Sequence, residues 1–554
     1  MPADVVHPGW TVVNLRPNAA FQPMVTGLGF LSDGSLVVSH WGGSHDKVQT
    51  RQMNGAVYIV KNVTGDKPSP VVTTYAENLE DPVGMLVKDD RIYVTGGEKM
   101  LELPDADKNG KAEAARAVVT IPGTHARHEF LFSGLFKDGK FWMNPSSAKD
   151  IGGGLPGWGQ KNPNRGTMMS VDPATGAYEV FAMGLREPNG IGIGPEGEIF
   201  APDVQGNWLP SCKLINVRKG RFYGFKHEPA ETWDNMKESP PAVYLPQGEL
   251  SRAPGNPLYI PTGKYAGQMF LGDVASGGIR RIFLEKVDGE YQGAAFFFSF
   301  GLEGGPNRLA WGPDGYLYVG ICGQGAGWSY KQDYGLQKMK PNDKVVFEML
   351  SIRSRKNGME IQYTDEINAA AADKAGYTVR TWNYAPTSDY GGSKIDTRIM
   401  TVAATQVSPD RKSVYLDIPG LAAGKVVYIG LNAGIASKAG DAVWTKETWY
   451  SLNAISPTGP FEGPTDLGEV QARHNAGLAR DIRLVAGEGR LSVRLAGRGR
   501  ASLEVRDIHG SLVTQAQGRD RLESGISTAG WASGVYAVSV RDGELSAERR
   551  FTLP

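Results

Sequence analysis

Oxygen-bearing side chains recur at alternate positions in the stretch that begins at Asp105. Asp105, Asp107 and Asn109 occupy its first, third and fifth positions, Gly110 the sixth and Glu113 the ninth. In calcium loops, alternate side chains converge on a hard cation while a glycine allows the sharp bend. Position twelve is an arginine, which cannot supply the usual bidentate carboxylate. Two interpretations therefore stay open: a weak structural Ca²⁺ site, and a solvated turn between strands.

The sequence lacks the signatures of several other chemistries. It has no HExxH zinc motif, no Walker loop, no GxSxG nucleophile elbow and no CxxCH haem site. Its 59 basic and 59 acidic side chains give zero net charge, which argues against nucleic acid or an anionic membrane as partner. No apolar run reaches the ~18 residues of a membrane helix, so we expect no transmembrane segment.

A short pattern recurs through the first 345 residues and must position any site. Each copy has a glycine, an apolar pair, a turn centred on Asp-Gly or an equivalent, and an alternating strand. Because Asp-Gly supplies the positive φ angles of a tight turn, each copy is predicted to be a β-hairpin. Six copies with room for two further strands each are typical of a β-propeller. The copies lie at residues 29–38, 84–94, 134–142, 190–200, 257–272 and 309–319.

The predicted fold is therefore all-β, with a six-bladed β-propeller over residues 1–345. In a propeller, the strands around the central channel deliver their loops to one face, where ligands bind. The segments expected there are polar and aromatic where a structural plug would be apolar, which favours a polar small molecule or a sugar as ligand. They are residues 39–41, 95–98, 144–146, 203–205, 273–274 and 320–322.

Several segments carry a resemblance to a known family. Residues 184–190 read Gly-Leu-Arg-Glu-Pro-Asn-Gly, residues 218–224 end in Phe-Tyr-Gly, and His128 precedes an Asp-Gly turn. With the last-blade stretch 309–315, these segments resemble the six-bladed quinoprotein sugar dehydrogenases, the soluble glucose or aldose and sorbosone dehydrogenase group. The resemblance covers about residues 20–340. It implies oxidation of a sugar by hydride transfer to pyrroloquinoline quinone (PQQ), which Ca²⁺ polarises.

The resemblance also implies roles for individual residues. His128 corresponds to the general base that takes the proton of the sugar hydroxyl, although a strand-edge histidine bonded to a carbonyl is the alternative. Arg186 corresponds to the side chain on the quinone carbonyl. The residues implied to line the cofactor and its ion are Asn189, Gln205, Asn207, Trp208, Asn307 and Arg308.

One departure from the family pattern favours a second interpretation, a propeller that acts without a redox cofactor. Glu187 stands where the family has an asparagine, so a carboxylate would lie beside a cofactor that carries three. At ~4 Å and an effective dielectric constant near 20, each such pair costs about 4 kcal/mol before solvent relaxes. Neutralising partners must come from a small set of cations: Arg186, Lys226, Arg252, Arg280 and Arg308.

Beyond the propeller, the sequence predicts two further β modules. Short alternating strands over residues 346–454 favour an immunoglobulin- or fibronectin-like β-sandwich. A linker rich in Pro and Gly spans residues 455–480, and no lysine follows Lys446. Residues 481–554 resemble the C-terminal sorting domain of the type IX secretion pathway, a small β-sandwich with a Gly-Val-Tyr strand; another interaction or carbohydrate-binding sandwich is the alternative. The sorting-domain resemblance implies export from a bacterium through the secretion machinery.

The start of the chain and its cysteines bear on the compartment. Met1-Pro2-Ala3-Asp4 lacks the charged and apolar regions of a signal peptide, so we expect a secreted or cell-surface protein whose signal has been removed. Cys212 and Cys322 could form one disulfide.

Three functional hypotheses follow. The first is an exported quinoprotein-like sugar oxidoreductase that passes electrons to an acceptor. The second is a propeller that binds or cleaves polysaccharide without a redox cofactor, using Glu187, His128 and Arg186. The third is a non-catalytic carbohydrate-binding surface protein, in which the sandwich binds.

Overall fold

The computed structural model describes residues 4–43, 53–123, 130–147, 164–226, 233–323, 325, 328–432 and 434–462, and then 482–487, 490–507, 512–527, 534–542 and 545–553. The chain divides into two compact units, Met1–Phe461 and Glu462–Pro554. In the described ranges almost every element is a β-strand, and the helices are short 3₁₀ turns such as η1 (Pro195–Gly197). The predicted all-β fold is confirmed. No helix in these ranges is long and apolar enough to cross a membrane.

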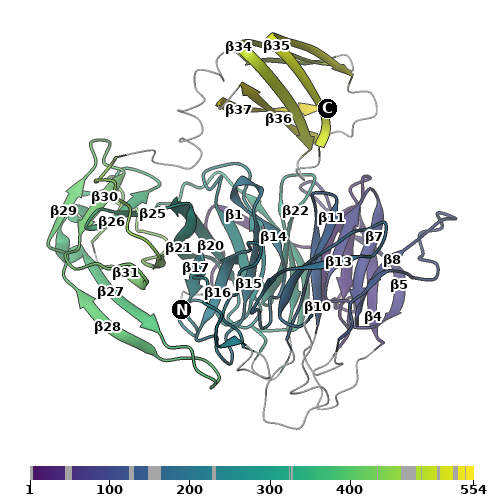
Figure 1. Ribbon diagram of the computed structural model, residues 1–554, viewed down its shortest axis with the longest axis horizontal. Helices are drawn as coiled ribbons and strands as arrows, with labels where there is room; N and C mark the ends of the chain where they lie inside the picture. The colour runs from purple at the N-terminus through teal and green to yellow at the C-terminus, as the bar shows by residue number, and fades with distance from the viewer. Residues whose placement is uncertain are drawn as a thin grey trace. The chain divides into compact units, whose positions relative to one another are not determined.

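Most of the first unit consists of four-stranded antiparallel sheets that follow one another along the chain (Figure 1). The first sheet contains β2 (Val25–Phe30), β3 (Leu36–His40), β4 (Gly55–Lys61) and β5 (Val71–Leu79). The second contains β6 (Met85–Lys88), β7 (Arg91–Gly96), β8 (Lys99–Leu103) and β9 (Arg116–Thr120). The third contains β10 (Leu131–Lys137), β11 (Lys140–Pro145), β12 (Thr167–Val171) and β13 (Tyr178–Met183). The fourth contains β14 (Gly192–Ile193), β15 (Ile199–Asp203), β16 (Cys212–Asn216) and β17 (Val243–Leu245).

The sixth sheet joins the two ends of the propeller. The fifth sheet starts with β18 (Pro254–Tyr259), β19 (Met269–Asp273), β20 (Ile279–Val287) and β21 (Glu290–Ser299). The sixth contains β22 (Pro306–Trp311), β23 (Leu317–Cys322), β24 (Tyr334–Pro341) and, at its outer edge, β1 (Trp10–Asn14). Strand β1 pairs antiparallel with β24 from Trp10 opposite Pro341 to Asn14 opposite Gln337. The first strand of the chain thereby closes the ring, which leaves fewer free sheet edges.

The first strands of successive sheets face one another around the ring. Strand β2 contacts β6 and β22, β6 contacts β10, and β18 contacts β14 and β22. Each of the six predicted hairpins is present as the first two strands of a sheet. The turn chemistry is also as predicted, since Asp138 and Gly139 have φ angles of 52° and 74°. Aspartate tolerates this left-handed region and glycine adopts it without cost.

The sandwich continues the fifth sheet of the propeller. Strand β21 pairs with β32 (Glu447–Leu452), from Gly293 opposite Ser451 to Phe296 opposite Thr448. The sheet then runs through β31 (Lys425–Leu431), β27 (Tyr377–Tyr384) and β28 (Lys394–Met400). A second sheet packs on it, formed by β25 (Met349–Arg355), β26 (Gly358–Tyr363), β30 (Ser413–Asp417) and β29 (Ala404–Val407).

One hydrophobic core joins the fifth blade to the sandwich. Phe283 and Phe296 of the blade pack in the same buried cluster as Ile352, Val379 and Val427 of the sandwich. Figure 1 shows the sandwich strands, in green, beside β20 and β21. Because sheet and core are shared, the sandwich is held in place by burial rather than by a flexible connection.

The second unit is a five-stranded antiparallel sheet over its described residues. It contains β33 (Ile482–Gly487), β34 (Arg490–Asp507), β35 (Leu512–Ser527), β36 (Gly534–Asp542) and β37 (Leu545–Leu553). Strand β34 is a single long strand of 18 residues. Strand β35 was not predicted, because its sequence lacks a run of alternating apolar residues.

Candidate active site in the axial pocket

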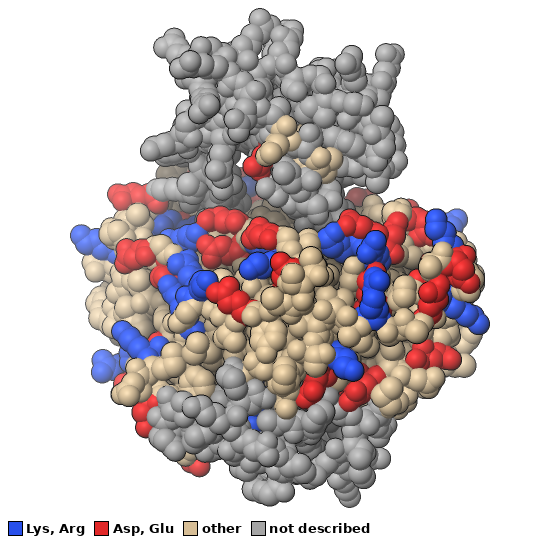
Figure 2. Space-filling model, turned by 45° about the vertical axis from the view of Figure 1, so that its right-hand side comes forward, with Lys and Arg blue, Asp and Glu red and all other residues tan. Residues whose placement is uncertain are grey.

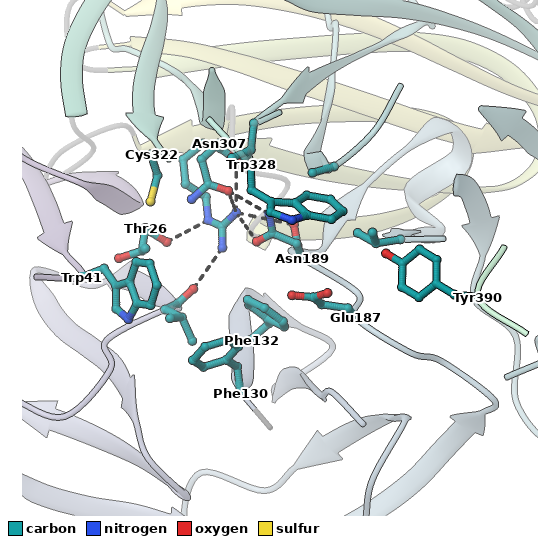
Figure 3. A pocket seen from close by; sticks show the side chains of 15 residues that line it. Thr26, Trp41, Phe130, Phe132, Glu187, Asn189, Asn307, Cys322, Trp328 and Tyr390 are labelled. Carbon is teal, nitrogen blue, oxygen red and sulfur yellow. Dashed lines mark hydrogen bonds between the residues drawn. The ribbon is translucent and has the colours of Figure 1, made fainter. Parts of the chain in front are cut away.

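A pocket lies where the first strands of the propeller sheets begin, and all six sheets or the loops beside them contribute to it. It contains about 690 Å³ of space, part of it open to solvent. Figure 3 shows it from close by. The lining residues are Thr26, Trp41, Val83, Phe130, Phe132, Glu187, Asn189, Val204, Ala253, Val274, Asn307, Arg308, Cys322, Trp328 and Tyr390.

Arg308, on β22, lies at the bottom of this pocket and is 5% exposed. Its Nε donates to the Thr26 carbonyl at 2.7 Å, and its Nη2 donates to the Val83 carbonyl at 2.9 Å. Within the described residues, no Asp or Glu forms an ion pair with it, so every acceptor it contacts is neutral. Burial lowers the pKa of Arg308 to about 10, which still leaves it charged at neutral pH.

Two asparagines complete the polar floor (Figure 3). Arg308 Nη1 donates at 2.9 Å to the Oδ1 atoms of both Asn189 and Asn307. Asn189 Nδ2 donates to Asn307 Oδ1 at 2.9 Å, and Asn307 Nδ2 donates to the Val25 carbonyl at 2.8 Å. The guanidinium is therefore bonded to the first, second, fourth and sixth blades or the loops beside them, which fixes its position without neutralising its charge.

Aromatic side chains form the walls of the pocket. Trp41, Phe130 and Phe132 lie on one side, and Trp328 and Tyr390 lie on the other (Figure 3). The rings of Trp41 and Phe130 meet edge to face with centroids 6.1 Å apart, and Trp41 Nε1 donates to Asp81 at 2.8 Å. Such walls suit the apolar faces of a sugar ring or a planar cofactor, while the floor addresses its polar atoms.

Glu187 lies on the wall beside Tyr390 and has a positive partner behind it. Arg186 Nη1 lies 3.3 Å from Glu187 Oε2, and the Arg186 side chain is 2% exposed. The Arg186 guanidinium also stacks on the Tyr390 ring, 5.2 Å from its centroid. Arg186 therefore supports two lining residues without lining the pocket itself.

Buried aspartates at the ends of second strands hold the loops that carry these groups. Asp203, at the end of β15, accepts the backbone N–H groups of Arg186 and Glu187, at 3.0 and 2.8 Å to its nearest oxygens. Burial raises the pKa of Asp203 to about 6, against the opposing effects of Lys213 and of these bonds. In the next blade, Asp273 accepts the backbone N–H of Arg252 at 2.8 Å. These predicted strand-end residues thus act mainly on the backbone, and their neighbours Val204 and Val274 line the pocket.

The other predicted site residues lie in different surroundings. Gln205, Asn207 and Trp208 do not line the pocket; Asn207 Nδ2 donates to the Ser388 carbonyl of the sandwich at 2.7 Å. His128 lies outside the described residues. Among the predicted cofactor-binding residues, the pocket therefore brings together Asn189, Asn307 and Arg308, and it adds Glu187.

The candidate cations are similarly divided. Arg308 lines the pocket, and Arg252 stacks behind Trp328 at 5.4 Å. Lys226 lies over Trp208 and pairs with Asp234, and Arg280 is fully buried against Phe297 and Phe300. The last two therefore lie away from the lining residues.

The Asp105 loop satisfies its carboxylates within the chain. Asp105 accepts the backbone N–H groups of Asn109 and Gly110, each at 3.0 Å, and Glu113 accepts that of Ala106 at 3.1 Å. Across the described residues, no group of three or more His, Cys, Asp or Glu side chains is arranged to hold a metal ion. A calcium ion bound by Asp105, Asp107, Asn109 and Glu113 therefore stays a prediction from spacing.

Of the five aromatic lining residues, sequence reasoning placed only Trp41 at the ligand face and missed Phe130, Phe132, Trp328 and Tyr390; it also left the cysteines open. Trp328 follows the sixth hairpin in a glycine-rich stretch, and its aromatic character was the available signal. Tyr390 comes from the sandwich, and nothing in its local sequence connects it with the propeller. Cys212 and Cys322 are both free and buried. Burial raises the pKa of Cys322 to about 12, so the thiol stays protonated at neutral pH despite lining the pocket.

Comparison with known proteins finds similarity in structure only. No family model matches the sequence, and no curated protein matches it. The PQQ-bound aldose sugar dehydrogenase of Streptomyces coelicolor is 17% identical, with a TM-score of 0.43 over 61% of this chain and 100% of that one. The PQQ domain of pyranose dehydrogenase from Coprinopsis cinerea, in its holo form, is 14% identical, with a TM-score of 0.45 over 60% and 96%. A gluconolactonase from Xanthomonas campestris is 13% identical, with a TM-score of 0.37 over 61% and 92%.

Proposed function

We propose that this protein is a sugar-oxidising enzyme of the quinoprotein kind, with its active centre in the axial pocket. The observation that carries the proposal is the buried guanidinium of Arg308. A buried charge is costly unless an opposite charge compensates it. Among the described residues its hydrogen-bond acceptors are neutral, so an anionic ligand group in the pocket would supply the compensation.

The described lining fits a planar anion such as PQQ in three respects. Aromatic rings stand on both sides, the floor is cationic, and the asparagine pair offers polar atoms beside the guanidinium. The carboxylate of Glu187 is the feature that disfavours a tricarboxylate, but Arg186 lies 3.3 Å from it and offsets its charge. Arg308, Asn189 and Asn307 would hold the cofactor. When bound, PQQ would accept the hydride that leaves the sugar carbon.

The protein's own groups would carry the remaining steps. Arg308 would stabilise negative charge at the floor, where its side chain is buried and a fixed charge acts strongly. Glu187 can accept a proton from a sugar hydroxyl at the wall, and Arg186 orients its carboxylate. His128, which precedes the lining residue Phe130 by two positions in the sequence, is the general base that the family resemblance implies.

The test is reconstitution of the full chain with PQQ and Ca²⁺, followed by absorbance of the bound quinone and dye reduction with a panel of aldoses. Arg308→Gln removes the charge, and Arg308→Lys retains it without the planar fork. Arg280→Gln is the matched control, because Arg280 is equally buried but donates to the carbonyls of Leu250 and Gly278 away from the pocket. We expect Arg308→Gln to lose PQQ binding by at least tenfold, Arg308→Lys to lose less, and Arg280→Gln to retain it.

Two results would contradict the proposal. Absence of both cofactor uptake and sugar-dependent reduction by the wild-type protein would reject the redox function. Sugar binding without turnover would instead support a carbohydrate-binding propeller, for which the aromatic walls are also suited.

We further propose that the protein is exported and that residues 481–554 act as a sorting domain, with 346–454 a sandwich module and 455–480 a linker. The support is the change from Lys to Arg after Lys446 and the Gly534-Val535-Tyr536 strand. Fusing Glu462–Pro554 to a reporter in a bacterium with type IX secretion tests it, and retention of the reporter inside the cell would contradict it.

A further inference from the structure

The hairpin between β27 and β28 reaches from the sandwich to the propeller. Its loop residues contact the segment between β15 and β16 of the fourth blade. Trp208 N donates to the Thr387 carbonyl at 2.7 Å, and Gly391 N donates to the Gly206 carbonyl at 3.0 Å. Asn207 and Tyr390 form an isolated antiparallel bridge. The hairpin loop is therefore bonded to the blade by its backbone on both sides of Tyr390.

Two glycines of this hairpin allow the close approach. A Cβ atom on Gly391, whose φ is +79°, would lie 2.8 Å from Gln205 Nε2. A Cβ atom on Gly392 would lie 2.4 Å from Pro210 Cβ. Side chains at either position would push the loop away from the blade. The segment 205–208, which the family resemblance linked to the cofactor, serves as the platform on which the sandwich loop docks.

Tyr390 is the residue that this docking delivers to the pocket. It lines the pocket beside Glu187 (Figure 3), and its ring stacks on the Arg186 guanidinium. Tyr390 is 44% exposed, whereas Arg308 at the floor is 5% exposed. A ligand bound at the floor would therefore leave the Tyr390 ring available to whatever enters at the mouth.

We propose that Tyr390 is a specificity-determining residue that contacts the sugar at the mouth of the pocket, so that the sandwich completes the active site of the propeller. This proposal rests on the proposed function insofar as the ligand is a sugar. A phenol ring presents a flat face to the apolar side of a pyranose, and the Arg186 stack holds that face in place. Tyr390 should therefore act on sugar affinity and leave cofactor affinity unchanged.

Substitutions at and beside Tyr390 test this assignment. Tyr390→Ala removes the ring, Tyr390→Phe retains it, and Asp389→Ala is the control because Asp389 is an exposed neighbour outside the lining. Three constants are measured on the full chain with D-glucose, D-xylose, D-mannose and maltose: KM of the PQQ-loaded protein, Kd for PQQ, and sugar Kd of the PQQ-free protein. The sugar Kd is followed by the change in tryptophan fluorescence on sugar addition, because Trp41 and Trp328 line the pocket. Thermal unfolding of each variant verifies that it folds.

We expect Tyr390→Ala to raise KM and the sugar Kd about tenfold, the scale of one aromatic contact, with Kd for PQQ unchanged. Tyr390→Phe and Asp389→Ala should stay within about twofold of wild type on every constant. Sugar constants within twofold of wild type in Tyr390→Ala, or an equal loss of PQQ affinity, would overturn the proposal. Wild-type protein that binds sugar without reducing dye would reject the redox function alone. The ratio of the sugar Kd of Tyr390→Ala to that of the wild type would still decide the role of Tyr390. Wild-type protein that binds no sugar would reject both.

Discussion

Glu348 offers the sharpest test of how the sandwich is attached to the propeller. Its carboxylate is buried between the N-terminal segment, the fifth blade and the start of the sandwich. It accepts a hydrogen bond from Tyr265, lies 2.8 Å from Lys264 Nζ, and lies 3.4 Å from His7 Nε2. Gly9 N donates to His7 Nδ1 at 3.0 Å, which leaves the imidazole proton on Nε2, facing Glu348. Substitution to Gln removes the charge that these three elements share.

The size of the effect follows from the pKa of Glu348. Burial opposes ionisation of the carboxyl, but the bond to His7 and the charges of Arg281 and Lys264 outweigh it and lower the pKa from 4.5 to about 2. A carboxyl whose pKa is lower in the folded than in the unfolded protein stabilises the folded state at pH values above the pKa of the unfolded protein. This stabilisation is lost as the pH falls from about 4.5 toward 2. The difference corresponds to about 3 kcal/mol at pH 7 and to about 1.4 kcal/mol at pH 3.

Urea unfolding of the full chain at pH 3, 5 and 7, followed by tryptophan fluorescence, measures this difference. We expect Glu348→Gln to lose about 3 kcal/mol at pH 7 and roughly half of that at pH 3. Glu285 is the matched control: it is equally buried, accepts Ser354 N at 2.7 Å, and burial raises its pKa. The stability that Glu285 contributes is therefore largest at low pH. The Glu285→Gln variant should still lose stability on acidification, because its Glu348 is intact. Equal destabilisation by Glu348→Gln at pH 3 and pH 7 would refute the electrostatic explanation.

Three further outcomes are expected. Gly206→Ala should weaken sugar binding about tenfold, because the new Cβ would lie 1.9 Å from Arg186 Nε and displace the side chain behind Tyr390; titration with D-glucose measures it. Asp203→Asn should speed hydrogen exchange at the Arg186 amide, since an amide group keeps only one acceptor oxygen facing that N–H; unchanged protection in mass spectrometry would contradict it. Chelation of Ca²⁺ should leave the Tm within about 1 °C, because Asp105 already bonds to backbone N–H groups; a larger shift, abolished by Asp105→Ala, would establish the calcium site.

The hairpins of the propeller could be predicted from sequence because their signal is local. A turn such as Asp138-Gly139 specifies positive φ angles, and the strands on either side follow from two-residue alternation. Closure of the ring has no such signal, since Trp10 pairs with Pro341 across almost the whole propeller. The same holds for the pairing of β21 with β32, where Ala294 lies opposite Tyr450. The sequence therefore indicated a separate sandwich, whereas the structure has one continuous sheet.

The residues of the candidate site show the same difference between local and long-range signals. Asn189, Asn307 and Arg308 were named from the resemblance to the quinoprotein sugar dehydrogenases, and all three line the pocket. Tyr390 could not be predicted, because its place depends on docking of one module on another. Arg186, which the family resemblance assigns to the quinone carbonyl, is not among the lining residues and stacks on Tyr390, so its contact with a ligand stays a prediction. Spacing within a motif identifies the element that carries a side chain, but packing decides which side of the wall it occupies.

The position of Arg308 connects the stability of the ring with the chemistry of the pocket. Its guanidinium pairs with no carboxylate of the described residues; it donates to carbonyl and amide oxygens of four blades or the loops beside them, including those of Thr26, Val83 and Asn189. A lysine could reach only some of these acceptors, because its donors radiate from a single nitrogen. The bonds that hold the blades at their separation around the axis are thus the bonds that keep a positive charge fixed at the floor. Such a charge needs little reorganisation when a ligand gains negative charge, which is the condition for electrostatic stabilisation of a transition state. Selection for a closed ring and selection for an anion-stabilising floor would therefore act on the same side chain.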